Sequence, residues 1–588
     1  MHEVVLAAAQ ETIEDETRER RLGQASNRLR HRPRIRDLEA YHLTTRSAPW
    51  VAINGGFTES PGKVCETASL LVRAHVGGAE KPYGGKSMYI TEAASPNTDR
   101  RNLDSIGFTL TQMINSASAL AMGEYVKAIQ QELLRGGHLL DHLYPVDPVV
   151  DLLPVRKGYF KVERMIHVIT RASSILRDHP SVLHTMVKVD HTDQVLRGAT
   201  SNGTCIREQS LGFRVGFYVV VAADPGPLES RDGGYRVMRL EDALYTTDPN
   251  AFNDSQFRAQ VTQRARMLLE ESVRRLSRDS CPDIVPEPGA LVLTSHDATC
   301  SRMHEALFGH LLCANLITDG QMPYALSRFG TQVLDERLSI VSDPTMVDDR
   351  EFPLGGSYSY DAECVPAKRK TLIDQGVWRD VQASRASAQR GNMLLARMGK
   401  APVFTPGDAR ISMFSHEKPA EPFERVSNID IQYHENGQPK TWKGMVKRFL
   451  DELRSRGLPY GYILNGSTDG IVSGDGSFYQ DYLFPQRIWA DGRIEPMSPI
   501  REVSQANTLY NDLVLMGGGK RYFTHRCGLI LDETRKVMRV NPSFIELSHD
   551  EADPNLIRTC VFTPAAIWQN ISLQPVQYPV VRNLRLIG

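Results

Sequence analysis

The sequence lacks several features that would place it in a common class of protein. Its eight cysteines include no Cys-x-x-Cys pair, so neither a zinc ribbon nor a disulfide scaffold is indicated. The longest apolar run, Phe217 to Ala223, is far shorter than the roughly 20 residues of a membrane-spanning helix. The first residues, Met1 to Ala9, carry no basic leader of the kind that signal peptides have. These absences predict a soluble, cytoplasmic protein with no membrane partner.

An excess of charge of either sign is also missing. Lys and Arg total 69 and Asp and Glu total 70, which gives a net charge of −1. This balance argues against a surface that is basic throughout, and we expect no nucleic-acid partner. The 588 residues are 41% hydrophobic and 24% charged, as in ordinary globular proteins, and their number suffices for roughly two to four domains.

A proline-rich junction, Pro282 to Pro288, separates two regions of different character. Before it, strand-like runs and amphipathic helical patterns are mixed. After it, short strand-like segments bounded by glycine-containing turns predominate. We therefore predict two domains, formed by residues 1–282 and 283–588.

Several local patterns predict individual elements. Residues 183–223 predict a β-hairpin, in which Asn202-Gly203 suits a type I′ turn. Residues 251–278 carry apolar side chains on one side of an amphipathic helix. The remaining predictions are strands at Pro49–Phe57, Ala68–Val76 and Gly289–Ser295, and a helix at Trp442–Arg456.

The sharpest chemical motif is His304-Glu305, followed by a second histidine at His310. Two neutral imidazoles can bind a metal ion, and an adjacent glutamate can take a proton from water. In the common form of such a motif the histidines are four residues apart, about 40° around a helix. Here they are six apart, about 240° by the same arithmetic, so a regular helix separates them unless it ends at Gly309 and His310 folds back. On spacing alone, two ordinary histidines of a buried helix are the favoured interpretation.

Other histidines and cysteines also have spacings that suit a metal site. His138 and His142 are four residues apart but have no adjacent glutamate. Cys313 follows His310 by three residues. His525 and Cys527 are two apart in a strand-like segment, which places them on one face.

The most distinctive segment runs from Gly356 to Arg369 and continues from Thr371 to Val377. It closely resembles a characteristic stretch of the TldD/PmbA family, whose members were once called modulators of DNA gyrase. Neighbouring pieces, including Val341–Thr345 and residues 391–414, follow in the family's order. The resemblance extends over most of residues 40–570.

This resemblance implies an α+β fold, with an N-terminal α/β domain and a β-rich C-terminal catalytic domain. It implies a metal-dependent peptidase or amidohydrolase in which His304, His310 and Cys527 hold the metal and Glu305 is the catalytic base. The expected metal is zinc, with iron as the alternative. The family's motif is His-Glu-x-x-x-His, so this chain has one extra residue between the histidines. If His310 does not reach the metal, Cys313 or His525 is the natural substitute.

The resemblance also suggests partners and substrates. Family members with the motif commonly pair with a motif-less TldE-type chain, so we expect a heterodimer with a TldE/PmbA-like chain, otherwise a homodimer. The expected substrate is a peptide or a small amide, and the altered motif suggests a specialised branch, such as peptide processing or N-deacetylation in antibiotic biosynthesis. The alternative is a non-catalytic partner subunit, although the retained His304, Glu305 and Cys527 argue against it. Charge and motifs give no support to a role at DNA gyrase.

Overall fold

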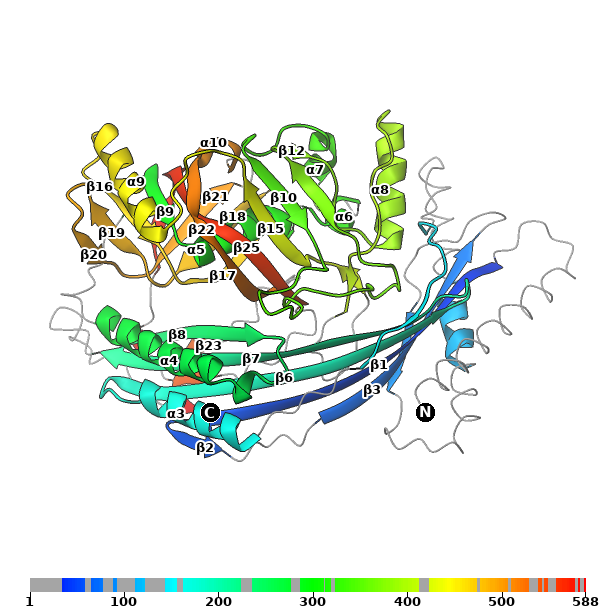
Figure 1. Cartoon of the computed structure of the whole chain (residues 1–588), viewed down its shortest axis with the longest axis horizontal. Coiled ribbons are helices and arrows are strands. Elements are labelled where there is room, and N and C mark those ends of the chain that lie inside the picture. Colours follow the sequence, from blue (N-terminus) through cyan, green and yellow to red (C-terminus); the bar gives the residue numbers. More distant parts are fainter. Residues whose placement is uncertain are drawn as a thin grey trace, which may run out of the picture.

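The architecture is taken from a computed structural model (Figure 1). The structure describes residues 34–58, 65–77, 88–92, 112–121, 143–155, 162–223, 235–276, 286–310, 312–318, 323–411, 422–472, 476–505, 509–527, 538–541, 544–547, 557–576, 580–581 and 586–587. None of the described helices is both long enough and apolar enough to cross a membrane.

A nine-stranded sheet forms the first structural region, with the order β27-β8-β7-β6-β1-β3-β4. The short β2 pairs with β1, and β5 pairs in parallel with one end of β7, while all other pairs are antiparallel. Its strands are β1 (Arg34–Ile53), β2 (Gly56–Thr58), β3 (Cys65–Gly77), β4 (Met88–Glu92), β5 (Val150–Leu152), β6 (Val182–Thr200), β7 (Cys205–Ala223), β8 (Tyr235–Thr246) and β27 (Val580–Val581).

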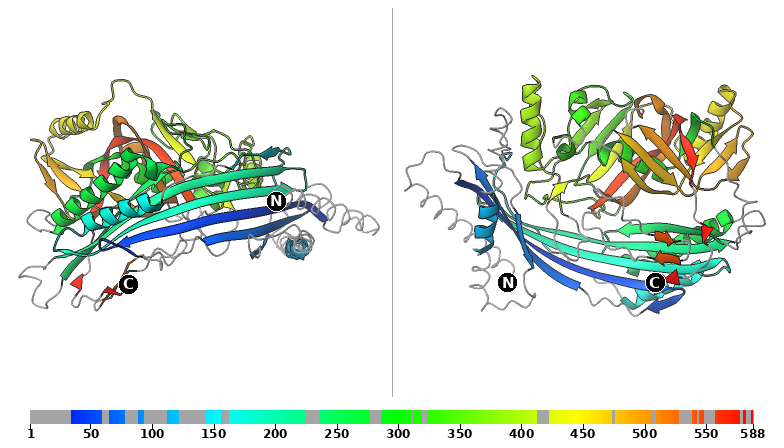
Figure 2. Two further views of the ribbon diagram at one scale, coloured as in Figure 1. Left: turned by 60° about the horizontal axis from the view of Figure 1, so that its bottom comes forward. Right: turned by 180° about the vertical axis from the view of Figure 1, so that it is seen from behind.

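Helices α3 (Val162–Leu176) and α4 (Ser255–Leu276) lie on one face at one end of these long strands (Figure 2). A short 3₁₀ turn, η3 (Ala251–Asn253), precedes α4. Apolar residues of α3 recur at helical spacing, and alternate residues of β6 and β7 point at them because side chains in a strand alternate between its faces. The resulting core includes Met165, Ile169, Ala172, Val187, Val189, Val215, Phe217, Val219, Val261 and Ala265.

The second region is built on a ten-stranded sheet of order β12-β11-β10-β15-β25-β9-β16-β19-β20, with β22 also paired to β25. The β15–β25 and β16–β9 pairs are parallel and the others are antiparallel. Its strands are β9 (Ala290–Thr294), β10 (Leu338–Ser342), β11 (Lys370–Asp374), β12 (Val377–Trp378), β15 (Asn428–Tyr433), β16 (Tyr460–Leu464), β19 (Gln486–Trp489), β20 (Ile494–Pro496), β22 (Leu513–Cys527) and β25 (Ile557–Ile571).

Two helices pack on opposite faces of this sheet because buried residues of β9 alternate between two cores. Leu291 and Leu293 pack with α9 (Trp442–Ser455) through Met445 and Phe449. Val292 belongs to the other core, together with residues of α5 (His296–Met303). The α5 face is the one that leads to the His-Glu motif.

Smaller elements complete the second region. A four-stranded antiparallel sheet has the order β17-β18-β21-β26, and its β17 and β18 contact both α5 and the turn that follows α5. Its strands are β17 (Ser467–Val472), β18 (Ser477–Tyr482), β21 (Ile500–Gln505) and β26 (Leu573–Pro575). The other helices and strands of this region are α6 (Ala314–Thr318), α7 (Pro323–Arg328), α8 (Arg385–Arg397), α10 (Leu509–Asp512), β13 (Ala409–Arg410) and β14 (Phe423–Glu424). A separate three-stranded sheet consists of β23 (Met538–Asn541), β24 (Phe544–Leu547) and β28 (Leu586–Ile587).

The α+β class is confirmed, because both regions combine helices with strands. The predicted boundary between residues 282 and 283 falls among residues 277–285, which lie outside the described residues, so it stays a prediction. One strand from the far end of the chain, β27, joins the first sheet beside β8.

The predicted hairpin is present as β6 and β7, but its turn is not type I′. That turn requires a positive φ at both central residues. Gly203 has a φ of 99°, whereas Asn202 is not among the described non-glycine residues with positive φ. The Gly203 amide donates to Thr200 O at 3.1 Å, and the Thr200 amide donates to Thr204 O at 3.0 Å. The first of these bonds makes Ser201 and Asn202 the central residues of the turn. The error arose because Asn-Gly was placed at the centre of the turn, one residue too late.

Candidate metal centre

Helix α5 is anchored at its first turn. It follows β9 after a single residue, Ser295, whose hydroxyl donates to Leu464 O at 3.1 Å. The Asp297 carboxylate accepts from the amide of Gly466 at 2.9 Å, which ties the helix to the loop between β16 and β17. The sheet therefore fixes where α5 begins and in which direction it runs.

The end of α5 carries the feature that brings the motif together. Residues His304–Phe308 form a single π-helical turn, η4, in which the Gly309 amide donates to His304 O at 2.9 Å. Such a turn accommodates one residue more than an α-helical turn and occurs often at functional sites. The one extra residue of the motif is thus absorbed as a π turn.

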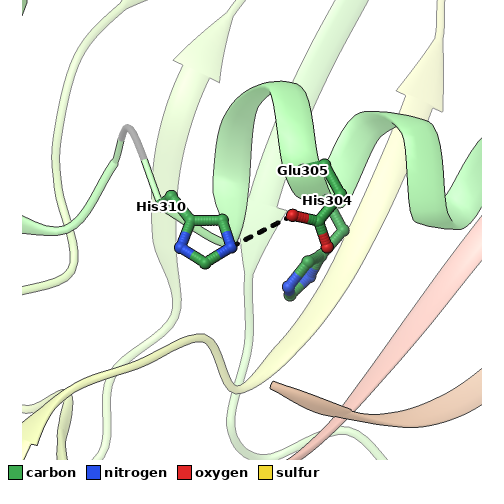
Figure 3. A group of neighbouring side chains, drawn as sticks. All are labelled: His304, Glu305 and His310. Carbon is green, nitrogen blue, oxygen red and sulfur yellow. Dashed lines mark ion pairs between the residues drawn. The ribbon is translucent and has the colours of Figure 1, made fainter. Parts of the chain in front are cut away.

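The π turn brings His304 and Glu305, which lie within it, close to His310, which follows it (Figure 3). One potential ligand atom from each residue lies within 4.8 Å of the others. The two imidazole rings have centroids 5.6 Å apart, and His310 Nε2 is 3.3 Å from Glu305 Oε2. The helix ends before His310, as the fold-back alternative required, so the separation expected for a regular helix does not occur.

The cluster is largely sheltered from water. His304 is 3% exposed and Glu305 is 8% exposed, and His310 is half-buried. Glu305 Oε2 is buried and has no hydrogen-bond partner among the described residues. A buried carboxylate oxygen without a donor is costly unless a cation or water satisfies it. Two imidazoles beside this oxygen are a donor set that suits a divalent ion such as zinc, so the residues present fit a metal.

Two glycines make room for these side chains. A Cβ on Gly309 would lie 2.4 Å from His304 Nε2, and a Cβ on Gly470 in β17 would lie 2.3 Å from Glu305 Cγ. Both distances are far below van der Waals contact. Gly309 therefore lets the backbone pass against one imidazole, and Gly470 lets the β17–β18 hairpin close over the glutamate.

A buried polar network anchors the last turn of α5, directly before the His-Glu motif. Arg302, fully buried, donates from Nε to Glu502 Oε1 at 2.8 Å, and its guanidinium lies 4.2 Å from the centre of the Trp568 ring. Ser301 Oγ donates to Gln480 Oε1 at 2.6 Å, which joins α5 to β18. Removing one partner of a buried ion pair typically lowers the free energy of unfolding by about 3–5 kcal/mol. This network therefore stabilises the turn of α5 that precedes His304.

The other predicted ligands lie elsewhere or outside the described part. The backbone of Cys527 ends β22, paired with Ile557, but its side chain and that of His525 lie outside the described residues. His138 and His142 are outside them as well. Cys313 is buried and donates to Gly309 O (3.6 Å) and Gln382 Oε1 (3.4 Å), and it is not part of the three-residue cluster.

Sequence reasoning missed the supporting residues. Gly470 and Gln480 lie more than 160 positions after the motif, and neither belongs to a recognisable pattern. Cys300 in α5 was also not singled out, and burial raises the pKa of its thiol well above the usual range, with Cys560, Asp297 and Glu305 adding to the effect. That thiol is therefore held in its neutral form.

Part of the chain is similar in sequence to proteins named as metallopeptidases. Residues 290–426 match the model of the PmbA/TldA metallopeptidase C-terminal domain. A curated protein named metalloprotease, from Methanothermobacter thermautotrophicus, is 28% identical over 266 residues, which are 44% of this chain and 48% of that protein. The chain thus spans about half the length of this curated relative.

Solved structures share the fold over nearly the whole chain. A putative modulator of DNA gyrase from Thermotoga maritima has a TM-score of 0.55 at 13% identity, covering 95% of this chain and 100% of its own. TldE from Thermococcus kodakarensis has a TM-score of 0.56 at 11% identity, covering 95% and 99%. At these identities the likeness concerns the fold alone.

The domain match concerns the part of the chain that carries the clustered His-Glu motif, and it is a match to a domain of the metallopeptidase class. More particularly, residues 290–426 are similar to the PmbA/TldA metallopeptidase C-terminal domain, and nearly the whole chain shares the fold of TldE and of a putative modulator of DNA gyrase. A domain of the metallopeptidase class implies a divalent metal.

Proposed function

We propose that this protein is a metal-dependent hydrolase of amide bonds, a peptidase or amidohydrolase of the TldD type. The observation that carries the proposal is the convergence of His304, Glu305 and His310 at the π turn, with one buried carboxylate oxygen left without a hydrogen bond. A structural helix gains nothing from such an oxygen, whereas a hydrolytic site needs it.

The proposed ligands are His304, His310 and Cys527, and the proposed metal is zinc, with iron as the alternative. Two imidazoles and a thiolate are donors that a borderline-soft divalent ion favours. Three protein ligands leave a fourth position for water or substrate, which is the arrangement of catalytic rather than structural zinc sites.

Glu305 is the proposed general base. When bound, the ion polarises the scissile carbonyl and makes water more acidic. Glu305 Oε2, which makes no hydrogen bond to a described residue and lies 3.3 Å from His310 Nε2, would take the proton from water and pass it to the leaving amine. Gly470 keeps the carboxylate in place because the hairpin packs directly on Glu305 Cγ. Burial of the cluster excludes bulk water and strengthens each electrostatic interaction in it.

The substrate is proposed to be an extended peptide or a small amide. Within the described part of the chain, β17 pairs only with β18 and so forms an edge of its sheet, directly beside Glu305. An edge strand offers unpaired amides and carbonyls to which an extended peptide can add as a further strand. Peptide processing or N-deacetylation in a specialised biosynthesis would use the same chemistry.

The chain is proposed to work in a two-chain assembly, with a TldE/PmbA-like chain or otherwise with a second copy of itself. The fold is shared with a protein named TldE, and the large sheets leave edges that a neighbour can cover. The second candidate function, a non-catalytic subunit that shapes a paralogue's site, requires that the cluster of His304, Glu305 and His310 binds no metal.

The metal content of the purified chain tests the two candidates against each other. We expect about one divalent ion per active chain by elemental analysis, and loss of amide hydrolysis when a chelator removes it. Hydrolysis should return when zinc or iron is added back. A chain that carries no stoichiometric metal and gains none from added zinc or iron would favour the non-catalytic subunit.

Sedimentation and activity measured together test the assembly. We expect the chain to sediment as a dimer, or to do so only when mixed with a TldE/PmbA-like chain encoded beside it. An obligate interface buries more than about 2,000 Å² in total, so the two chains should stay together during sedimentation. Activity should rise with the formation of that complex. A stable monomer with full activity by itself would refute the assembly and leave the metal site unaffected.

A further inference from the structure

A shallow recess separate from the metal cluster lies between the first sheet and the second region, with a cavity volume of about 60 Å³. One wall is the face of β6 and β7, where two cross-strand pairs, Gln194 with Ser210 and Leu196 with Glu208, stand side by side. The facing wall consists of Ser357–Ala362, from the distinctive sequence segment, and Ala409–Ile411. The proposed hydrolysis does not use this recess.

Hydrogen bonds between the two walls fix its shape. The Ser359 amide donates to Glu208 Oε1 at 3.1 Å, and Tyr360 Oη donates to Asp151 Oδ2 in β5 at 2.7 Å. The Asp361 carboxylate accepts from three backbone amides, those of Glu363, Val365 and Ala409. The distinctive segment therefore connects the two regions through hydrogen bonds. The polar groups of Ser359, Tyr360 and Asp361 already have hydrogen-bond partners.

Glu208 is the exception among the acidic groups that line the recess. Its Oε2 atom is buried and has no hydrogen-bond partner among the described residues. No ion pair to Glu208 is present in the described part of the chain either. Beside this oxygen the lining is largely apolar, formed by Leu196, Ala362, Ile411 and the tyrosine rings. A ligand that fits must therefore donate a hydrogen bond at one end and present apolar surface along the rest.

We propose that this recess binds an alkylammonium group, whose charged nitrogen donates to Glu208 Oε2 while its alkyl chain lies against Leu196 and Ile411. An ammonium offers three donors and positive charge, so it satisfies a buried carboxylate better than a neutral amide does. The ligand spans both walls, so it holds the first sheet to the second region. The group can come from a free amine or from a lysine side chain of a polypeptide.

The charges around Glu208 are of both signs, but the one cation among the described lining residues, Arg410, is engaged by other groups. The pKa of the Glu208 carboxyl is raised to about 7, chiefly by burial and further by Asp151, although hydrogen bonds from Ser359 and from the Tyr360 backbone act to lower it. The other charged or titratable groups facing the recess are Tyr358, Tyr360, Asp361 and the cationic Arg410. Arg410 stacks on Tyr358 and donates to Gly356 O and Val426 O. An ammonium favours the ionised carboxylate, so binding should strengthen as the pH rises through the folded pKa.

Binding of n-butylamine to the full chain, measured by calorimetry, tests the proposal, with n-butanol as the uncharged control. We expect binding at pH 8, about tenfold weaker binding at pH 6 because Glu208 is then largely protonated, and none of n-butanol. Glu208→Gln should abolish binding while keeping the metal content. Glu163→Gln, on the exposed surface of α3, should leave binding unchanged. Thermal melting of each variant shows that it is folded.

A second binding measurement distinguishes the two possible sources of the alkylammonium group. A terminally blocked Gly-Lys-Gly peptide that binds more tightly than n-butylamine supports a polypeptide ligand, and n-butylamine binding alone supports a free amine. The proposal is overturned if neither binds, if n-butanol binds equally well, or if folded Glu208→Gln binds as the unaltered chain does. Because the readout is binding rather than hydrolysis, these results are independent of the metal site.

Discussion

Replacing Glu305 with glutamine should lower the rate of amide hydrolysis by about 100-fold or more, the usual contribution of a general base, while the metal stays bound. Glutamine nearly matches the size of glutamate and fits beneath Gly470, but it cannot accept the proton. The two imidazoles proposed to hold the ion are unchanged. The measurement is hydrolysis of a confirmed amide substrate, with elemental analysis of the same preparation.

Glu270→Gln is the matched control for this variant because Glu270 lies exposed on α4, in the first region. It should retain full activity. If Glu305→Gln turned over substrate at a rate near that of the unaltered chain, Glu305 would not be the base. If it lost its metal as well, Glu305 would have to be counted among the ligands.

Replacing Cys527 with serine should remove most of the bound metal and, with it, most of the hydrolysis. A thiolate is a far stronger donor to zinc than a hydroxyl that remains protonated at neutral pH. Cys527 is the last residue of β22, so an isosteric change there leaves the pairing with Ile557 intact. Elemental analysis before and after dialysis measures the loss.

Cys205→Ser serves as the control because Cys205 is a buried cysteine in the first sheet. Its metal content should not change. Unchanged metal in Cys527→Ser would rule out Cys527 as a ligand, and the same assay on Cys313→Ser and His525→Ala would then show which substitute completes the site.

Local patterns predicted the elements whose stability is largely local. The helix at Trp442–Arg456 and the amphipathic helix in 251–278 correspond to α9 and α4. The strand at Pro49–Phe57 was placed too late, because β1 begins at Arg34. The polar stretch before Pro49 has no clear alternation and is a strand because β3 and β6 pair with both of its edges. Strand formation of this kind depends on neighbours rather than on the residues themselves.

The motif itself could be found in the sequence, but not its geometry. The spacing of His304 and His310 argued against a shared site on a regular helix. Only the hydrogen bond from Gly309 to His304 O shows that the extra residue forms a π turn. Gly470 and Gln480 could not be found, because their roles depend on packing between segments far apart in the chain.

The pairing of β27 with β8 has a consequence for synthesis on the ribosome. Every strand of the second region is translated after Thr246 and before Val580. At about 5–20 residues per second, the nascent first sheet therefore waits on the order of tens of seconds for its β27 strand. During that time the β8 edge can pair with another nascent chain. Fragments or fusions that end before Val580 should be aggregation-prone for the same reason.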